Sequence, residues 1–213
     1  MYFSAGFTAF IFFIFLLLLY KPKGFTSFVN TERTVSQYLT HTLAPELYNG
    51  LQSDQAFDVN IVDAGLNQAF FYLGWPKKFG PITCFSPAVI FNPQRIVILD
   101  KIRFAGLDFA VTVVIRPFFD TAGLLNLDIE MIKTGALKTT FPAKIIARRL
   151  YQKKVSSQPQ PLPDWQTALA AALFDNKPFT PVFFIDDRKV LLEKINVEKS
   201  VLKIRLLPLE TKN

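Results

Sequence analysis

Few residues in this chain have side chains and spacings that could support catalysis or bind a metal. Asp186 and Asp187 are adjacent, but neighbouring carboxylates in a turn between strands normally point apart and serve the turn. Asp128 and Glu130 stand two residues apart on a predicted strand, so they share its polar face; they could bind a cation weakly, although a solvated sheet face explains them without any ligand. His41 is the only histidine, so a histidine metal site or catalytic dyad would lack its second member.

Sequence motifs for common enzyme chemistry are also missing. The sequence has no Gly-rich phosphate loop, no G-x-S-x-G, no C-x-x-C and no H-E-x-x-H. The single cysteine, Cys84, excludes an internal disulfide and leaves the redox compartment open. We therefore expect a protein that is not an enzyme and that uses neither a metal nor a cofactor.

Composition and charge favour a lipid partner. Half of the 213 residues are hydrophobic and 23 are Phe, so the chain must hide much apolar surface or offer some of it to a ligand. The net charge of +7 suits an anionic membrane or a nucleic acid. Nucleic acid is disfavoured because basic residues are dispersed among acidic ones and no RNP-like aromatic signature occurs.

Residues 2–20 form an uncharged, Phe-rich segment that is long enough to cross a bilayer. Nineteen helical residues at about 1.5 Å each cover roughly the 30 Å hydrocarbon core. No basic region precedes the segment and no small-x-small cleavage site follows it, so we interpret it as an uncleaved single-pass anchor rather than a signal peptide. The predicted domains are an anchor at 1–23, a juxtamembrane helix and linker at 24–56, and an α+β domain at 57–213.

The sequence gives conflicting indications of the side of the membrane on which the domain lies. Lys21 and Lys23 follow the segment, and the positive-inside rule alone would leave the domain in the cytoplasm. The family resemblance described below favours the extracytoplasmic side instead. Small residues such as Gly6 and Ala9 could also pack against neighbouring helices, so residues 2–20 could join a larger membrane protein complex.

The first part of the domain is predicted to contain a strand that leads into a helix. A short helix near 35–43 should end at Pro45 and give way to a linker. Alternation at 57–61 then predicts a strand. The helix that follows should end at Gly74. Its candidate apolar residues are Leu66, Phe70, Phe71 and Leu73.

Four strands with short connections are predicted next, at 82–91, 95–105, 107–118 and 124–134. Apolar and polar residues alternate in the third and fourth, so two antiparallel neighbours should share one apolar side. The residues on that side are Phe109, Val111, Val113 and Ile115, with Leu127 and Ile129.

The last part of the chain should add two helices and close the sheet. A helix starting near Pro142 has an apolar side at Ile145, Ile146 and Leu150. Its opposite side is basic and could rest on an anionic membrane or simply be solvated. The basic residues are Lys144, Arg148, Arg149, Lys153 and Lys154. After a Pro-rich connector, a helix from Asp164 precedes strands at 179–185 and 189–207.

The segments "VNIVDAGLNQAFFYL", "VIFNPQRIVILDKIRFAGLDFAVTVVIRPFFDTAGLLNLDIEMIKTGALKTTFP" and "VLLEKINVEKSVLKIRLLP" together resemble the YpmS-like and LmeA-like envelope proteins. These are short relatives of the tubular lipid-binding (TULIP) superfamily. The shared features are an early helical Asn, an Arg-Pro pair ending a strand and glycines at the turns. Those positions are Asn67, Gly106, Arg116, Pro117, Gly123, Gly135 and Pro142 here.

The resemblance implies a curved antiparallel sheet wrapped on amphipathic helices, with acyl chains bound in the apolar groove between them. The apolar residues named above are the candidate groove lining, because each CH₂ buried there contributes about 0.8 kcal/mol. The same residues could instead pack against one another in a dry core. The chain could also be an accessory subunit whose sheet domain docks on a partner protein.

Overall fold

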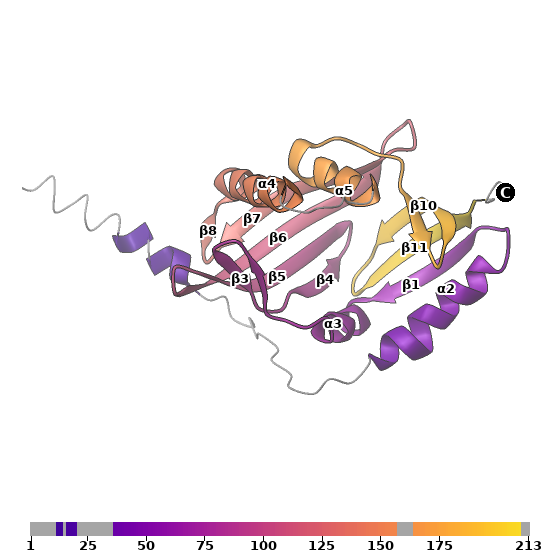
Figure 1. The fold of residues 1–213 in the computed structure, drawn as a ribbon, viewed down its shortest axis with the longest axis horizontal. Coiled ribbons are helices and arrows are strands. Elements are labelled where there is room, and N and C mark those ends of the chain that lie inside the picture. Colours follow the sequence, from indigo (N-terminus) through magenta and orange to yellow (C-terminus); the bar gives the residue numbers. More distant parts are fainter. Residues whose placement is uncertain (1–11, 15, 21–35, 157–163, 210–213) are drawn as a thin grey trace, which may run out of the picture.

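The computed structural model describes residues 12–14, 16–20, 36–156 and 164–209 and has an α+β fold with two antiparallel sheets (Figure 1). The helical elements are η1 (Leu39–Leu43), α2 (Ala44–Leu51), α3 (Asp63–Phe71), α4 (Thr140–Ser156) and α5 (Asp164–Asp175). The strands are β1 (Phe57–Val62), β2 (Lys77–Phe79), β3 (Ile82–Cys84), β4 (Ala88–Asn92), β5 (Arg95–Phe104), β6 (Leu107–Phe119), β7 (Leu125–Thr134), β8 (Leu137–Lys138), β9 (Val182–Ile185), β10 (Arg188–Val197) and β11 (Val201–Pro208). The coarse prediction of an α+β chain with antiparallel pairing is confirmed.

The larger sheet runs in the order β2-β3-β5-β6-β7-β8, with β4 paired to β5. Strands β5, β6 and β7 form the predicted meander, joined by short turns. Ala105 and Gly106 between β5 and β6 both have positive φ, at 51° and 82°. Such angles match the twist of a two-residue hairpin turn, and the glycine adopts them without steric cost.

One predicted strand is divided in the structure. The segment expected at 82–91 breaks at residues 85–87 into β3 and β4, both of which pair with β5. The Asp100 carboxylate accepts a hydrogen bond from the Ser86 N–H at the break. Pro87 has no N–H to contribute to a strand ladder, which explains why pairing stops there.

The smaller sheet has the order β1-β11-β10-β9. The expectation that 179–185 and 189–207 close the larger sheet is therefore wrong. The second segment divides into β10 and β11, and these strands form a sheet of their own with β9 and β1. An isolated bridge between Leu125 and Phe179 joins β7 to the segment before β9. The core of the smaller sheet packs against α2, and its buried residues are Leu51, Val59, Leu125, Val190, Leu192 and Leu206.

Helix α3 is fastened to the β4 edge of the larger sheet by Asn67. Its side-chain amide donates to the Val89 carbonyl oxygen at 2.7 Å, and its carbonyl oxygen accepts from the Val89 N–H at 2.6 Å. One side chain thus satisfies both backbone groups that the edge strand would otherwise leave open. The helix was predicted to end at Gly74, whose φ is 69°, but it ends at Phe71, so Leu73 lies beyond it.

The predicted end of the first helix at Pro45 is wrong. The chain stays helical to Leu51, because a π-helical turn at η1 leads directly into α2 with Pro45 in its first turn. Proline lacks an N–H and clashes with the carbonyl four residues before it in a regular helix. The wider π turn and the position at a helix start avoid both penalties.

The predicted anchor lies mostly outside the described residues. Within the described part, residues 12–14 and 16–19 are helical, and no described helix is both long enough and apolar enough to cross a membrane. The Ala136 N–H donates to the Leu17 carbonyl oxygen at 2.8 Å, so this segment contacts the β7–β8 turn. It lies at the end of the larger sheet where β5 turns into β6 (Figure 1).

Candidate apolar groove

The larger sheet has one apolar face whose middle strands are less buried than its margins. On that face the β4 residues Val89 and Phe91 are 5% and 1% exposed, and Ile129 and Ile132 of β7 are 8% and 6% exposed. The residues between them on β5 and β6 are only half-buried: Ile96, Ile98, Ile102, Phe109, Val111, Val113 and Ile115. In a filled core the central strands would be the most buried, so this face is open along its middle.

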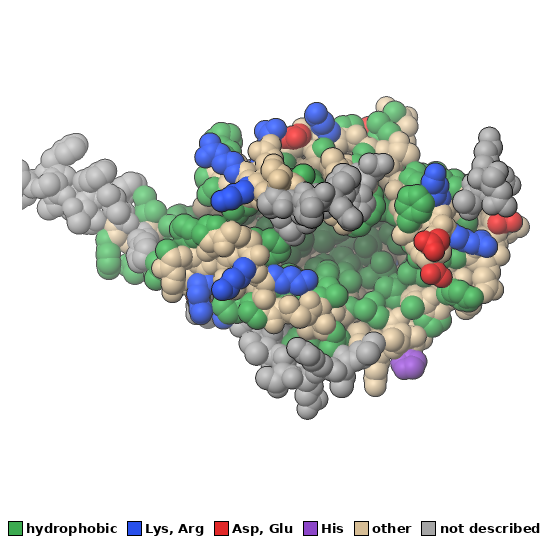
Figure 2. Space-filling model, viewed as in Figure 1, with side chains coloured by type: hydrophobic (Ala, Val, Ile, Leu, Met, Phe, Trp, Pro, Cys, Tyr) green, Lys and Arg blue, Asp and Glu red, His purple; other side chains and the backbone are tan. Residues whose placement is uncertain are grey.

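Figure 2 shows this opening as a hollow lined by hydrophobic side chains. It lies over the middle of the larger sheet, between α4 and α5 on one side and α3 on the other (Figures 1 and 2). We call it the apolar groove, with β5 and β6 as its floor. The register confirms the floor, since Ile96 pairs with Ile115, Ile98 with Val113 and Ile102 with Phe109.

One wall of the groove is formed by α3 and β4. Leu66 and Phe70 of α3 pack against the buried Val89 and Phe91, together with Ile98 of the floor. This contact confirms the predicted apolar side of the helix at Leu66 and Phe70. Helix α3 lies along the β4 edge, where Asn67 holds it.

The opposite wall consists of α4 and α5, which both contact β7. The two helices are held together by an ion pair between Arg148 and Asp175 at 3.0 Å and by a hydrogen bond from Lys144 to Asn176 at 3.2 Å. The rings of Tyr151 and Phe174 also meet at a tilt, with 5.9 Å between their centroids. This wall is therefore a helical pair rather than a single long helix.

The floor is long enough for one acyl chain. From Phe109 to Ile115 the β6 strand advances about 20 Å at roughly 3.3 Å per residue. One acyl chain occupies about half of the roughly 30 Å hydrocarbon core of a bilayer. A lipid tail could therefore lie along the floor within the length of β6.

The structure brings most of the predicted groove residues together. Phe109, Val111, Val113 and Ile115 form the floor, and Leu127 lies half-buried beside them on the same face of β7. The other predicted residue of β7, Ile129, is buried on the same face. It belongs to the strand that α4 and α5 contact, so it lies at the side of the groove and does not line the opening.

Other predicted lining residues lie farther from the floor. Phe71 is half-buried and its ring meets that of Tyr72 edge to face, while Leu73 is 51% exposed beyond the end of α3. On α4, Ile145 and Ile146 are 38% and 53% exposed. Leu150 is half-buried and lies 3.3 Å from where a Cβ on Gly80 would stand, so it meets the β2–β3 turn instead.

The five predicted membrane-surface residues of α4 have different environments. Lys144 and Arg148 are engaged by α5, as described above. Arg149 and Lys153 are exposed, and the side chain of Lys154 lies outside the described residues. At most part of this set is therefore available to an anionic surface.

Sequence reasoning missed the β5 half of the floor. Ile96, Ile98 and Ile102 alternate with Val97 and Leu99, so both faces of the strand are apolar and periodicity alone does not show which one faces the groove. The signal that was available is the short Ala105-Gly106 turn. It sets the register with β6 and places the even-numbered β5 residues beside Phe109 and Val113.

One carboxylate lies on the apolar face, near the β3 end of the groove. Asp100 pairs with Val111 and accepts a hydrogen bond from the Ser86 N–H at 3.2 Å. Burial raises the pKa of Asp100, and hydrogen bonds from Ser86 and from the Cys84 thiol oppose that rise. Burial and the nearby Asp100 charge raise the pKa of Cys84 to about 12. A thiol with this pKa stays protonated near neutral pH and is a poor nucleophile.

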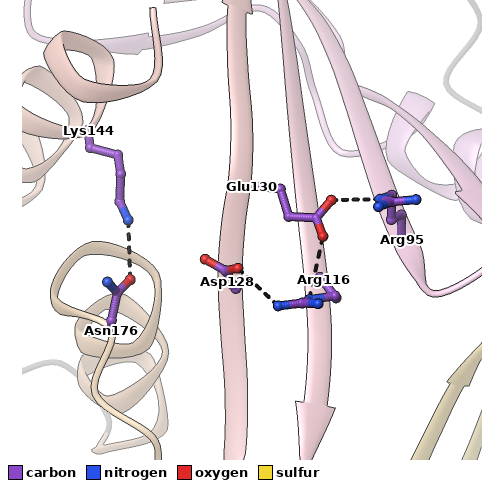
Figure 3. Close-up of polar contacts among 6 residues, drawn as sticks. All are labelled: Arg95, Arg116, Asp128, Glu130, Lys144 and Asn176. Atoms are coloured by element: carbon purple, nitrogen blue, oxygen red, sulfur yellow. Dashed lines mark hydrogen bonds and ion pairs between the residues drawn. The ribbon is translucent and has the colours of Figure 1, made fainter.

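The carboxylates that could have bound a cation are paired with guanidinium groups (Figure 3). On the outer face of the sheet, Glu130 lies 2.6 Å from Arg95 and 3.5 Å from Arg116, which also reaches Asp128 at 3.4 Å. The Arg95 contact lowers the pKa of Glu130. No cluster of three potential ligands that could hold a metal occurs among the described residues.

The remaining candidates from the sequence have plain structural environments. Asp186 and Asp187 have φ values of 49° and 63° and are exposed in the β9–β10 turn, as expected of turn residues. His41 is exposed in η1. A cavity of about 180 Å³ beside β7 is lined by Phe118, Asn126, Leu127, Asp128, Ala172, Asn176 and Lys177.

Comparison with known proteins yields no relative: no family model, no curated protein and no solved structure matches the chain. The resemblance to YpmS-like and LmeA-like proteins therefore stays a prediction. The apolar groove itself must carry the functional argument.

Proposed function

We propose that this protein is a membrane-anchored, non-enzymatic lipid-binding module of the bacterial cell envelope, with a TULIP-like domain on the extracytoplasmic side. The observation that carries the proposal is the half-buried apolar floor, represented by Val113 and Ile98, between buried margins. Apolar surface that folding leaves open in this way is offered to an apolar ligand.

The chemistry of the groove suits an acyl chain. Each CH₂ moved from water into the groove contributes about 0.8 kcal/mol, so a lipid tail needs no specific polar contact to bind. The charged residues of the sheet, such as Arg116 and Glu130, pair with each other on the outer face. On the groove face the floor is formed by isoleucine, valine and phenylalanine, with Asp100 beside it near β3.

The proposal is tested by cross-linking lipid to the full-length protein. The protein would be expressed in bacterial cells fed with a fatty acid that carries a photoreactive group, irradiated in the membrane, and digested for peptide mass spectrometry. Cross-links on β5 and β6 peptides that contain Ile98 and Val113 are expected. Cross-links confined to residues 2–20 would show only lipid around the anchor and would count against the groove.

The alternative, an accessory subunit of a larger membrane complex, predicts a different product of the same irradiation. A protein partner seated on the floor would keep lipid away from Val113. Photoreactive amino acids incorporated at positions 98 and 113 would then form cross-links to a protein of defined mass. Cross-links to lipid at those two positions would instead favour the lipid-binding function.

A further inference from the structure

The apolar floor of the groove continues to the β5–β6 turn and is exposed there. Phe104 follows Ile102 on the same face of β5, and Leu107 precedes Phe109 on the same face of β6. Phe104 and Leu107 pair with each other directly beside the turn and are 47% and 38% exposed. We call these two residues and the turn between them the β5–β6 tip.

The tip lies at the same end of the molecule as the apolar N-terminal segment (Figure 1). The Gly135 N–H donates to the Ala110 carbonyl oxygen, and the next residue, Ala136, donates to Leu17. Residues of that segment are also exposed, with Phe12 at 61% and Tyr20 at 52%. Two separate parts of the chain thus expose aromatic and aliphatic side chains at one end.

Basic side chains predominate at this end, where the carboxylate of Asp108, next to Leu107, is paired with Arg103 at 2.6 Å. Lys77 and Lys78 of β2 are exposed, as are Lys133 and Lys138 of the β7–β8 hairpin, beside which Leu17 is bound. On the face drawn in Figure 2, this end carries Lys and Arg side chains and no acidic ones. Lysines around an exposed apolar tip match an anionic bilayer, since the apolar groups enter the acyl region and the ammonium groups remain at the headgroups.

From this arrangement we infer that the β5–β6 tip inserts into the membrane and forms the mouth through which a lipid tail passes between bilayer and groove. The inference deepens the proposed function and rests on it for the passage of lipid. Insertion of the tip is a separate physical claim. A continuous apolar path from Leu107 to Val113 would spare a lipid tail any exposure to water on the way.

Insertion is tested with an environment-sensitive fluorophore on the full-length protein in vesicles of phosphatidylcholine and phosphatidylglycerol. The label is attached to Leu107→Cys in a Cys84→Ser background. The matched control is Phe184→Cys, because Phe184 is an exposed β-strand aromatic, at 62%, in β9 at the other end of the molecule. We expect a blue-shifted emission and quenching by lipid-borne nitroxides at position 107, and neither change at position 184.

Two outcomes would overturn the inference: an aqueous emission at position 107, or equal quenching at both positions, which would mean general adsorption. The double variant Phe104→Ser and Leu107→Ser provides a second measurement that needs no label. These exposed residues contribute little to folding, so the variant should keep its thermal transition and lose most of its rate of lipid uptake from vesicles. Acyl cross-links at Val113 with a tip that stays in water would refute the inference alone, whereas an inserted tip with no lipid in the groove would refute the proposed function alone.

Discussion

Replacing Val113 with Asp places a carboxyl group in the middle of the groove floor. Val113 is half-buried and lies between Ile98 and Ile132 across the sheet, so without lipid the new carboxylate can remain hydrated and the domain should fold. With an acyl chain above it, the group must either lose its hydration or become protonated. The cheaper of these two processes sets the loss of affinity.

The cost of protonation gives a ceiling that depends on pH. A free Asp has a pKa of about 3.9, so protonating it at pH 7 costs about three units at roughly 1.4 kcal/mol each, or about 4 kcal/mol. Lipid affinity of the Val113→Asp variant should therefore fall by up to about 10³-fold at pH 7. At pH 5 only about one unit remains, so the loss should shrink to about tenfold.

Thr112→Asp is the matched control, because it adds the same group to the same strand on the opposite face. Thr112 is also half-buried, and its cross-strand neighbour Lys133 can pair with the carboxylate. Binding of a fluorescent lipid analogue would be titrated for both variants at pH 7 and pH 5. Equal affinities in the two variants, or a Val113→Asp defect that does not change with pH, would refute the assignment of the floor.

Three further predictions concern the framework of the groove. Asn67→Ala removes two partly buried hydrogen bonds and should lower the free energy of unfolding by about 1–3 kcal/mol in chemical denaturation, whereas Asn196→Ala, an exposed site, should change it by less than about 0.5 kcal/mol. Gly65→Ala should cost about 1–3 kcal/mol in the same assay, because the Tyr38 ring occupies the Cβ position. Cys84 should react with maleimide far more slowly than a free thiol at pH 7 and speed up as the pH approaches its pKa of about 12. Unchanged stability of Asn67→Ala or Gly65→Ala, or fast labelling of the Cys84 thiol, would contradict these predictions.

The sequence was most informative where structure depends on neighbouring residues. Strands β6 and β7 were predicted because apolar and polar residues alternate along them and short turns join them. The division into two sheets was missed because the pairing of β1 with β11 joins residues as distant as Phe57 and Leu206. No local pattern encodes such a contact. The helix through Pro45 was missed because a π turn is not apparent from residue spacing.

Whether the apolar face encloses a groove or a filled core depends on which of its residues are covered. The periodicity of the sequence does not contain that information. Alternation places Val113 and Ile129 on the same face but says nothing of what covers each one. In the structure Ile129 is buried beneath the helical wall, and Val113, one strand farther in, is not. The two long sides of the face, at β4 and β7, are closed by buried residues such as Phe91 and Ile132. Its middle is open, and the opening continues to the exposed β5–β6 tip. A groove that takes up an apolar ligand from one end requires this arrangement.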